Sequence, residues 1–194
     1  MTENEQTGLG SAFGSKTKGS QIGYGHPHAK SLIESACDVL KDSETGRKHL
    51  KLLDLKKVPV QVIKGTGQSG FTPELMTIYM QASGNLTRAT GSFILNFFKA
   101  LNEAAQELAG FRTPDPRKDI MAYASFIHGR NLDSITETCK VVKELTNTVH
   151  FQDLLDSLTE MGLSGVYKAY IDGKSRDELY EQYASAYDAT RGRH

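Results

Sequence analysis

The sequence has no tryptophan, only two cysteines and no excess of either charge. Lysine and arginine number 23, as do aspartate and glutamate, so the formal net charge is zero. Proteins that bind nucleic acid or anionic membranes gain affinity by neutralising phosphates and usually carry a basic surplus. The charge balance therefore argues against nucleic acid and against a membrane surface as partners.

Long apolar runs are also missing. No stretch approaches the roughly 20 apolar residues of a transmembrane helix, and residues 1–10 are polar and acidic, unlike a signal peptide. Cys37 and Cys139 are too few for the disulfide framework of a small secreted protein, so we expect two buried thiols in a reducing compartment. Together these features favour a cytoplasmic protein.

The apolar residues that are present suffice for one core. The chain has 194 residues, 38% of them hydrophobic, and we expect a single domain over residues 31–190. Residues 1–30 are rich in Gly, Ser, Thr, Lys and Gln, which predicts a disordered tail because such a segment cannot repay the entropy of ordering itself. Within this tail, His26 and His28 are interpreted as polar linker rather than as a metal site.

Hydrophobic spacing predicts an α+β domain that is predominantly helical. A helical period runs through most of residues 31–190, and an especially wide apolar stripe covers residues 93–108. Residues 58–63, VPVQVI, are β-branched and predict a strand, with residues 77–80 as the returning strand. We therefore expect a small β-hairpin or short sheet packed on the helices.

The second half of the sequence predicts several helices. Asp115 and Pro116 are expected to open one whose apolar face includes Ile120 and Met121 and which ends at Gly129. A separate helix is expected from Leu132 to Val149. Ser175 and Glu178 form a capping box that predicts the start of the last helix.

A glycine pattern after the predicted strand tests for a nucleotide site. Gly65, Gly67 and Gly70 match G-x-G-x-x-G, which in dinucleotide-binding folds lets the backbone approach a pyrophosphate. No acidic residue lies between Glu74 and Glu103, where the ribose-binding carboxylate is expected, and the strands are too few for a doubly wound sheet. A glycine-rich turn is the better interpretation.

No complete catalytic or metal site is recognisable in the sequence. Cys139 falls on an apolar helix face, where a thiol is desolvated and inert, and no G-x-S-x-G pattern occurs. We therefore assign no catalytic residue, no metal ligand and no cofactor.

Several segments, taken together, resemble a family of bacterial zinc-metallopeptidase domains with a zincin-like fold. The similar segments are residues 43–46 (SETG) opening a helix, the strand 58–63, residues 70–73 (GFTP) with 77–80 (TIYM), and residues 97–106. The last segment, FFKALNEAAQ, is similar to the family's site helix, whose pattern is L-A-H-E-L-R-H-A-x-Q. The resemblance implies a short sheet before a site helix, and a later helix whose residues 131–136 approach the same cleft.

The departures from the family pattern fall on the chemistry. Lys99 replaces the first histidine, Ala100 the general-base glutamate, and Glu103 the second histidine, while Asn131 stands at the third ligand. A protonated lysine has no lone pair for a metal, and alanine cannot activate water. The resemblance therefore implies a degenerate member with a vestigial cleft near Lys99, Ala100, Glu103, Asn131 and Asp133.

Three functions remain open from the sequence. The first is a non-catalytic, zincin-like domain that binds a protein partner, which is not an enzyme. The second is a helical adaptor or structural subunit unrelated to zincins. The third is a hydrolase with an unrecognised site, which would place a histidine near a carboxylate in a pocket.

Overall fold

The computed structural model describes residues 22–56, 58–111 and 114–191. It is an α+β structure in which helices predominate, as the hydrophobic spacing predicts. Along the chain the elements are β1 (Ile22–Tyr24), α1 (Ala29–Lys41), α2 (Glu44–Lys56), β2 (Val60–Lys64), β3 (Gly70–Thr72), the 3₁₀ helix η2 (Pro73–Leu75), β4 (Thr77–Ala82), α3 (Gly91–Leu108), α4 (Ile120–Glu144), α5 (Phe151–Glu160), α6 (Ser164–Ile171) and α7 (Arg176–Arg191).

The strands form one mixed sheet in the order β1-β2-β4-β3. β1, β2 and β4 are parallel, with Val60 paired to Ile78 and Val62 to Met80, whereas β3 runs antiparallel along the outer side of β4. The short sheet is therefore present, but the expected hairpin between residues 58–63 and 77–80 is wrong. Because β2 and β4 end at the same edge, the connection from β2 to β3 crosses the carboxyl end of β4.

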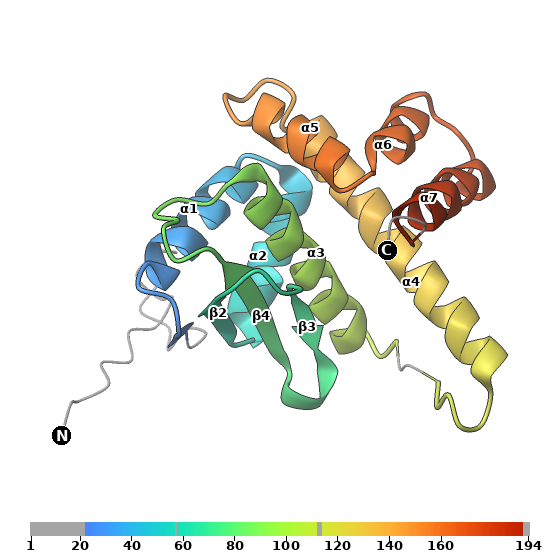
Figure 1. The fold of residues 1–194 in the computed structure, drawn as a ribbon, viewed down its shortest axis with the longest axis horizontal. Coiled ribbons are helices and arrows are strands. Elements are labelled where there is room, and N and C mark those ends of the chain that lie inside the picture. Colours follow the sequence, from blue (N-terminus) through green and yellow to red (C-terminus); the bar gives the residue numbers. More distant parts are fainter. Residues whose placement is uncertain (1–21, 57, 112–113, 192–194) are drawn as a thin grey trace.

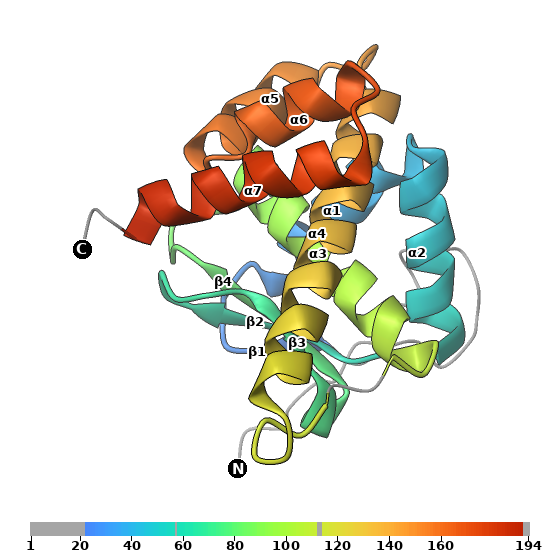
Figure 2. The ribbon, with the colours of Figure 1, turned by 90° about the vertical axis from the view of Figure 1, so that its right-hand side faces the viewer.

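Helices α1 and α3 pack on one face of the sheet, and α4 to α7 lie beyond α3 (Figure 1). Val62 of β2 and Met80 of β4 point to the covered face and are buried, while the alternate residues Gln61 and Tyr79 are partly exposed. This period of two follows from the pleat of the strands. α3 is the central helix, and α4 passes between it and α7 (Figure 2).

Helix α4 differs most from the prediction. It has 25 residues and continues through Gly129, where the sequence predicted an end. It begins at Ile120, because the Asp119 side chain accepts a hydrogen bond from the backbone nitrogen of Ala122 at 2.8 Å. Glycine in a helix interior costs about 1 kcal/mol relative to alanine, which the contacts of a long helix can offset.

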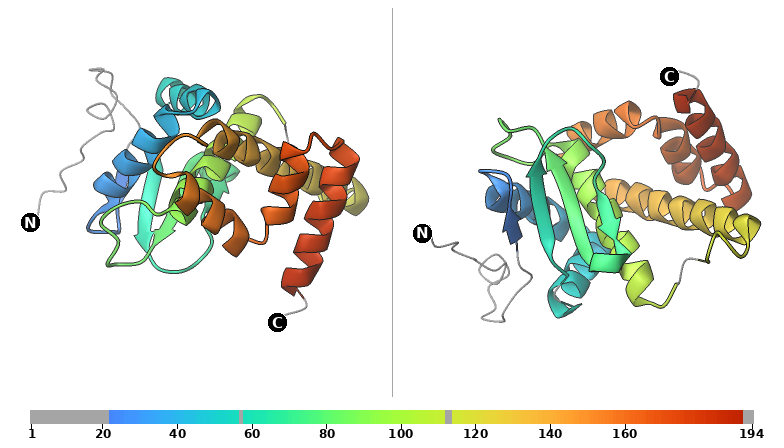
Figure 3. Two further views of the ribbon diagram at one scale, coloured as in Figure 1. Left: turned by 90° about the horizontal axis from the view of Figure 1, so that it is seen from above. Right: turned by 60° about the horizontal axis from the view of Figure 1, so that its bottom comes forward.

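The first half of α4 is poorly covered. Its buried residues all lie from Leu132 onwards, and Ile120 and Met121, expected in the core, are 61% and 72% exposed. Figure 3 shows this half of α4 extending past the end of α3. The predicted apolar face of residues 120–129 is therefore largely a surface.

Glu144, at the end of α4, holds the start of α2. Its carboxylate accepts hydrogen bonds from the hydroxyls of Ser43 and Thr45 at 2.5 and 2.7 Å, and from the backbone nitrogen of Thr45 at 2.8 Å. Partial burial alone would raise the pKa of Glu144, but these hydrogen bonds outweigh it and the pKa lies below its usual value. A carboxylate stabilises a helix N-terminus because unpaired N–H groups and the positive end of the dipole lie there.

The predicted tail, residues 1–30, includes residues that belong to the folded domain. Residues 22–30 form β1 and the start of α1, while residues 1–21 lie outside the described part of the chain. His26, interpreted as linker, is 1% exposed, and its Nε2 lies 2.6 Å from the carbonyl oxygen of Ser83. This contact ties the segment before α1 to the loop after β4. None of the described helices has both the length and the apolar character required to cross a bilayer.

Candidate binding groove

A polar stripe runs along the partly exposed side of α3. Its members recur every three or four residues and therefore share one face of the helix. They are Ser92, Asn96, Lys99, Glu103 and Glu107. The helix begins where the Thr90 hydroxyl accepts a hydrogen bond from the backbone nitrogen of Phe93 at 3.3 Å. Its other faces bury the large apolar side chains that join the sheet to the outer helices.

Two cavities follow one another along this stripe. One, of about 500 Å³, lies between the first half of the stripe, residues 65–69 of the β2–β3 connection and the end of β4. The other, of about 660 Å³, lies between the second half, residues 71–74 and the first half of α4. The two cavities follow one another along α3 and along residues 65–74 on the opposite wall. We therefore describe them as one groove. We call the first cavity its lysine half and the second its acidic half.

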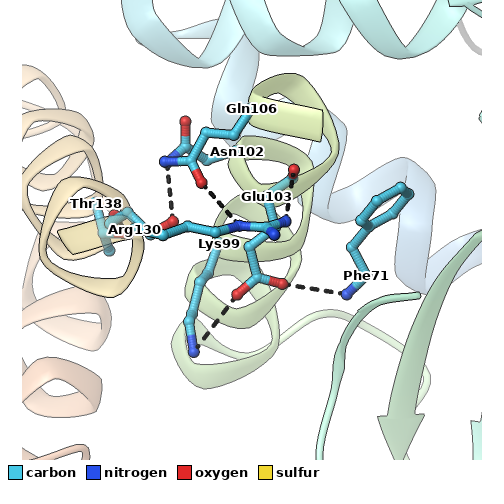
Figure 4. Close-up of polar contacts among 8 residues, drawn as sticks. Phe71, Lys99, Asn102, Glu103, Gln106, Arg130 and Thr138 are labelled. Carbon is cyan, nitrogen blue, oxygen red and sulfur yellow. Dashed lines mark hydrogen bonds and ion pairs between the residues drawn. The ribbon is translucent and has the colours of Figure 1, made fainter. Parts of the chain in front are cut away.

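A contact between α3 and β3 separates the two halves. Glu103 Oε1 lies 3.8 Å from Lys99 Nζ, and Glu103 Oε2 accepts a hydrogen bond from the backbone nitrogen of Phe71 at 3.2 Å. Figure 4 shows the carboxylate between the ammonium and the strand. The two side chains are 36% and 17% exposed, so the pair is partly shielded from water. Glu103 thus accepts a hydrogen bond from a backbone N–H on the outer side of the edge strand.

The acidic half is named for its charged lining. Among the described residues, four acidic side chains line it and one basic side chain, Arg130 of α4. The acidic residues are Glu74, Glu103, Glu107 and Asp115. Arg130 donates to the side-chain oxygen of Gln106 and to the backbone oxygen of Glu103, both at 3.1 Å. Arg130 Nη1 lies 3.6 Å from Glu107 Oε2. That oxygen is buried and accepts no hydrogen bond from the described residues.

The five residues expected at a vestigial cleft are divided between four places. Lys99 lines the lysine half of the groove, and Glu103 and Asn131 line the acidic half. Ala100 does not line the groove, because it lies on the packed side of α3 with 0% exposure. Asp133 lies outside the groove as well, in an ion pair of 2.8 Å with Arg176 of α7. A carboxylate at position 100 would therefore be buried in the core.

The sequence did not point to Phe71 or Arg130. Phe71 takes part through its backbone, which no side-chain pattern signals. Arg130 was missed because a helix end was expected at Gly129, whereas the continuous helix places Tyr123, Ile127 and Arg130 on one side, facing the groove. The spacing of these residues, at i, i+4 and i+7, is the signal that was available.

The two cysteines and His49 lie outside the groove and are buried in the packing of the helices. Burial raises the pKa of the Cys37 and Cys139 thiols to about 12, and both are free. His49 is buried between helices, with Nδ1 2.9 Å from the carbonyl oxygen of Thr45 and Nε2 3.1 Å from the side-chain oxygen of Asn102. These rings and thiols pack helices together, and the expectation of buried cysteines is confirmed.

Within the described part of the chain, no three side chains of His, Cys, Asp or Glu are grouped closely enough to hold a metal ion. Comparison with protein-family models, with curated proteins and with solved structures finds no match. The likeness to zincin-like domains therefore depends on the residues quoted above. What the structure defines is the class: an α+β domain with a four-stranded mixed sheet and a groove between its edge strand and a central helix.

Proposed function

We propose that this protein is a non-catalytic, zincin-like domain that binds another protein, and that the partner occupies the groove. The observation that supports this most is the contact of Lys99, Glu103 and Phe71. The family resemblance places two imidazoles at positions 99 and 103. Here these positions hold an ion pair that is turned towards the edge strand.

The surroundings of this pair argue against hydrolysis of a bound peptide. A lysine ammonium has no lone pair to donate to a metal ion. Position 100, where the family has its general base, is an alanine with 0% exposure. A carboxylate placed there would have to be desolvated, and could not activate water in the groove.

The shape and position of the groove favour a polypeptide as partner. Its two cavities, of about 500 and 660 Å³, extend along several turns of α3 beside an edge strand. The proposed location is the cytoplasm, where Cys37 and Cys139 would remain thiols.

A second candidate is a helical adaptor that docks through the first half of α4. The observation that favours it is the exposure of Ile120 and Met121 on α4, while Phe111, 58% exposed, lines a small cavity with Phe126 of the same helix. Apolar side chains gathered on a surface are a feature of protein-binding sites. In this case the groove would have no partner.

Site-specific photo-crosslinking in the native cell tests the proposal and separates the candidates. A photoreactive residue is placed at Gln68 in the lysine half, at Glu74 in the acidic half, at Met121 on α4, and at the exposed Lys48 of α2 as control. We expect the same protein to be captured from Gln68 and Glu74 and not from Lys48. Capture from Met121 alone would support the adaptor instead.

A charge reversal checks that the adduct depends on the groove. Lys99→Glu places two like charges one helical turn apart and would displace Glu103 from Phe71. This variant should lose the adducts from both groove positions, whereas Lys48→Glu should keep them. Adducts that survive Lys99→Glu unchanged would refute the proposal.

A further inference from the structure

The lysine half of the groove has an unusual lining. Among the described residues that line it, Lys99 is the only charged one, and none is acidic. Most of the others have hydroxyl or amide side chains. Residues 65–69, which form one wall, belong to the glycine pattern that the sequence predicts to be a turn.

Two of the hydroxyl groups that line this cavity accept a backbone hydrogen bond and can still donate their own proton. Ser69 Oγ accepts a hydrogen bond from the backbone nitrogen of Gln81 at 2.9 Å, and Thr90 Oγ1 accepts from the backbone nitrogen of Phe93 at 3.3 Å. Each hydroxyl has one proton and two lone pairs. Neither donates its proton to another described residue, so the proton is available to a ligand that offers acceptor atoms.

The start of α3 contributes little charge of its own to this cavity. The carboxylate of Asp153 already accepts a hydrogen bond from the backbone nitrogen of Gly91 at 2.6 Å. Attraction of an anion must therefore come from Lys99. Its ion pair with Glu103, at 3.8 Å, is too long for a strong hydrogen bond, and leaves N–H donors of the ammonium without a close partner among the described residues.

We propose that the lysine half of the groove is a binding site for an oxyanion, a phosphate or carboxylate group, held by Lys99 and by the hydroxyl of Ser69. Both residues are near Glu103, because a Cβ added at Gly70, next to Ser69, would lie 3.6 Å from Glu103 Oε2, and Lys99 Nζ lies 3.8 Å from Glu103 Oε1. The ligand would accept hydrogen bonds from both, while Glu103 competes for the ammonium from the other side. The proposal does not depend on a protein partner, because the group could belong to a small molecule as well as to a side chain.

The test is a titration of the ¹⁵N-labelled full chain with inorganic phosphate, and separately with acetate, at constant ionic strength. We expect saturable shifts confined to the amides of residues 65–70 and of the first half of α3. Saturation by phosphate alone would assign a phosphate-bearing ligand, and saturation by both anions a general oxyanion site. Shifts that do not saturate, or that spread over the surface, would overturn the proposal.

Three variants make the result specific. Lys99→Gln should weaken phosphate binding by roughly ten- to a hundredfold, since it removes a charge-assisted hydrogen bond, whereas Lys48→Gln on α2 should leave it unchanged. Glu103→Gln should tighten binding, because it removes the charge that competes for the ammonium. Equal affinity in the wild type and Lys99→Gln, or weaker binding in a folded Glu103→Gln, would contradict the assignment.

Discussion

At the scale of single residues, one carboxylate joins the end of α4 to the start of α2. Glu144 reaches from the end of α4 to Ser43 and Thr45 at the start of α2, 99 or more residues away in sequence. Replacing a side chain that caps a helix N-terminus costs about 1 kcal/mol. We expect Glu144→Gln to lower the free energy of unfolding at pH 7 by about that amount, and Glu181→Gln, on the exposed side of α7, to change it little.

The pH dependence of this effect has a definite sign. The pKa of Glu144 is lowered in the folded protein, so its contribution is present above the unfolded pKa, near 4.3, and is lost as the pH falls through the lower folded value. Urea denaturation of both proteins between pH 7 and pH 3 measures it. The difference between wild type and Glu144→Gln should shrink with acid, and a difference that grows would be inconsistent with the contacts.

The two thiols give a second prediction at this scale. Burial raises the pKa of Cys37 and Cys139 to about 12, so almost no thiolate forms at pH 8. A disulfide reagent should modify neither cysteine in the native protein within minutes, and both once denaturant is added. Rapid labelling of one thiol in the native state would show that its helix is not packed as described.

At the scale of elements, two helical glycines should respond oppositely to alanine. A Cβ at Gly91 would overlap the backbone of Asp153 and lie 2.6 Å from Ser157 Oγ, because α3 and α5 meet there. At Gly129 no described atom beyond the adjoining turns of α4 lies within 4 Å of an added Cβ. Gly129→Ala should stabilise the protein by about 0.5–1 kcal/mol, and Gly91→Ala should destabilise it. Thermal unfolding of both variants decides this, and a destabilising Gly129→Ala would argue against a continuous α4.

The two halves of α4 should also differ in local stability. All buried residues of the helix lie from Leu132 onwards, and local opening is easiest where few apolar contacts oppose it. Amide hydrogen exchange of the free protein should therefore be faster at residues 120–131 than at residues 132–144. Equal protection of both halves in the free protein would mean that residues 120–131 are covered without a partner. The adaptor alternative instead requires a bound partner to cover them.

The same elements show how far the sequence predicts the fold. Residues 93–108 carry a wide apolar stripe between clear end signals, and the helix was predicted within two residues of its start. The break at Gly129 was wrong, because the cost of one glycine is small beside the packing of a long helix. The pairing of β4 was wrong as well, since parallel or antiparallel pairing depends on the crossing connection and not on the strand's own residues.

The groove was only partly predictable. The family resemblance placed Lys99, Glu103 and Asn131 at a cleft, and all three line the groove. Ala100 and Asp133 were placed there by resemblance too, but the packing of α3 buries the first and the pairing with Arg176 holds the second outside. Which side of a helix is covered depends on its neighbours, and these are set by the tertiary fold.

At the scale of the whole molecule, the groove is the junction of the sheet with the outer helices. Residues from β3, α3 and α4 form its walls, and a single ion pair with a backbone hydrogen bond divides it. Under the proposed function, this division lies where the family resemblance would place a metal centre. An ammonium and a zinc ion cannot occupy the same end of the groove, because both are positive and compete for Glu103.

The most direct test of the non-catalytic assignment is the zinc content of the chain. The full-length wild type and Lys99→His/Glu103→His are each purified, incubated with excess Zn²⁺, freed of unbound metal by gel filtration and measured by mass spectrometry of the elements. The wild type should retain far less than one zinc per chain, and the double variant more, because its two imidazoles lie one helical turn apart. One zinc per wild-type chain, lost on Glu103→Gln, would contradict the proposed function.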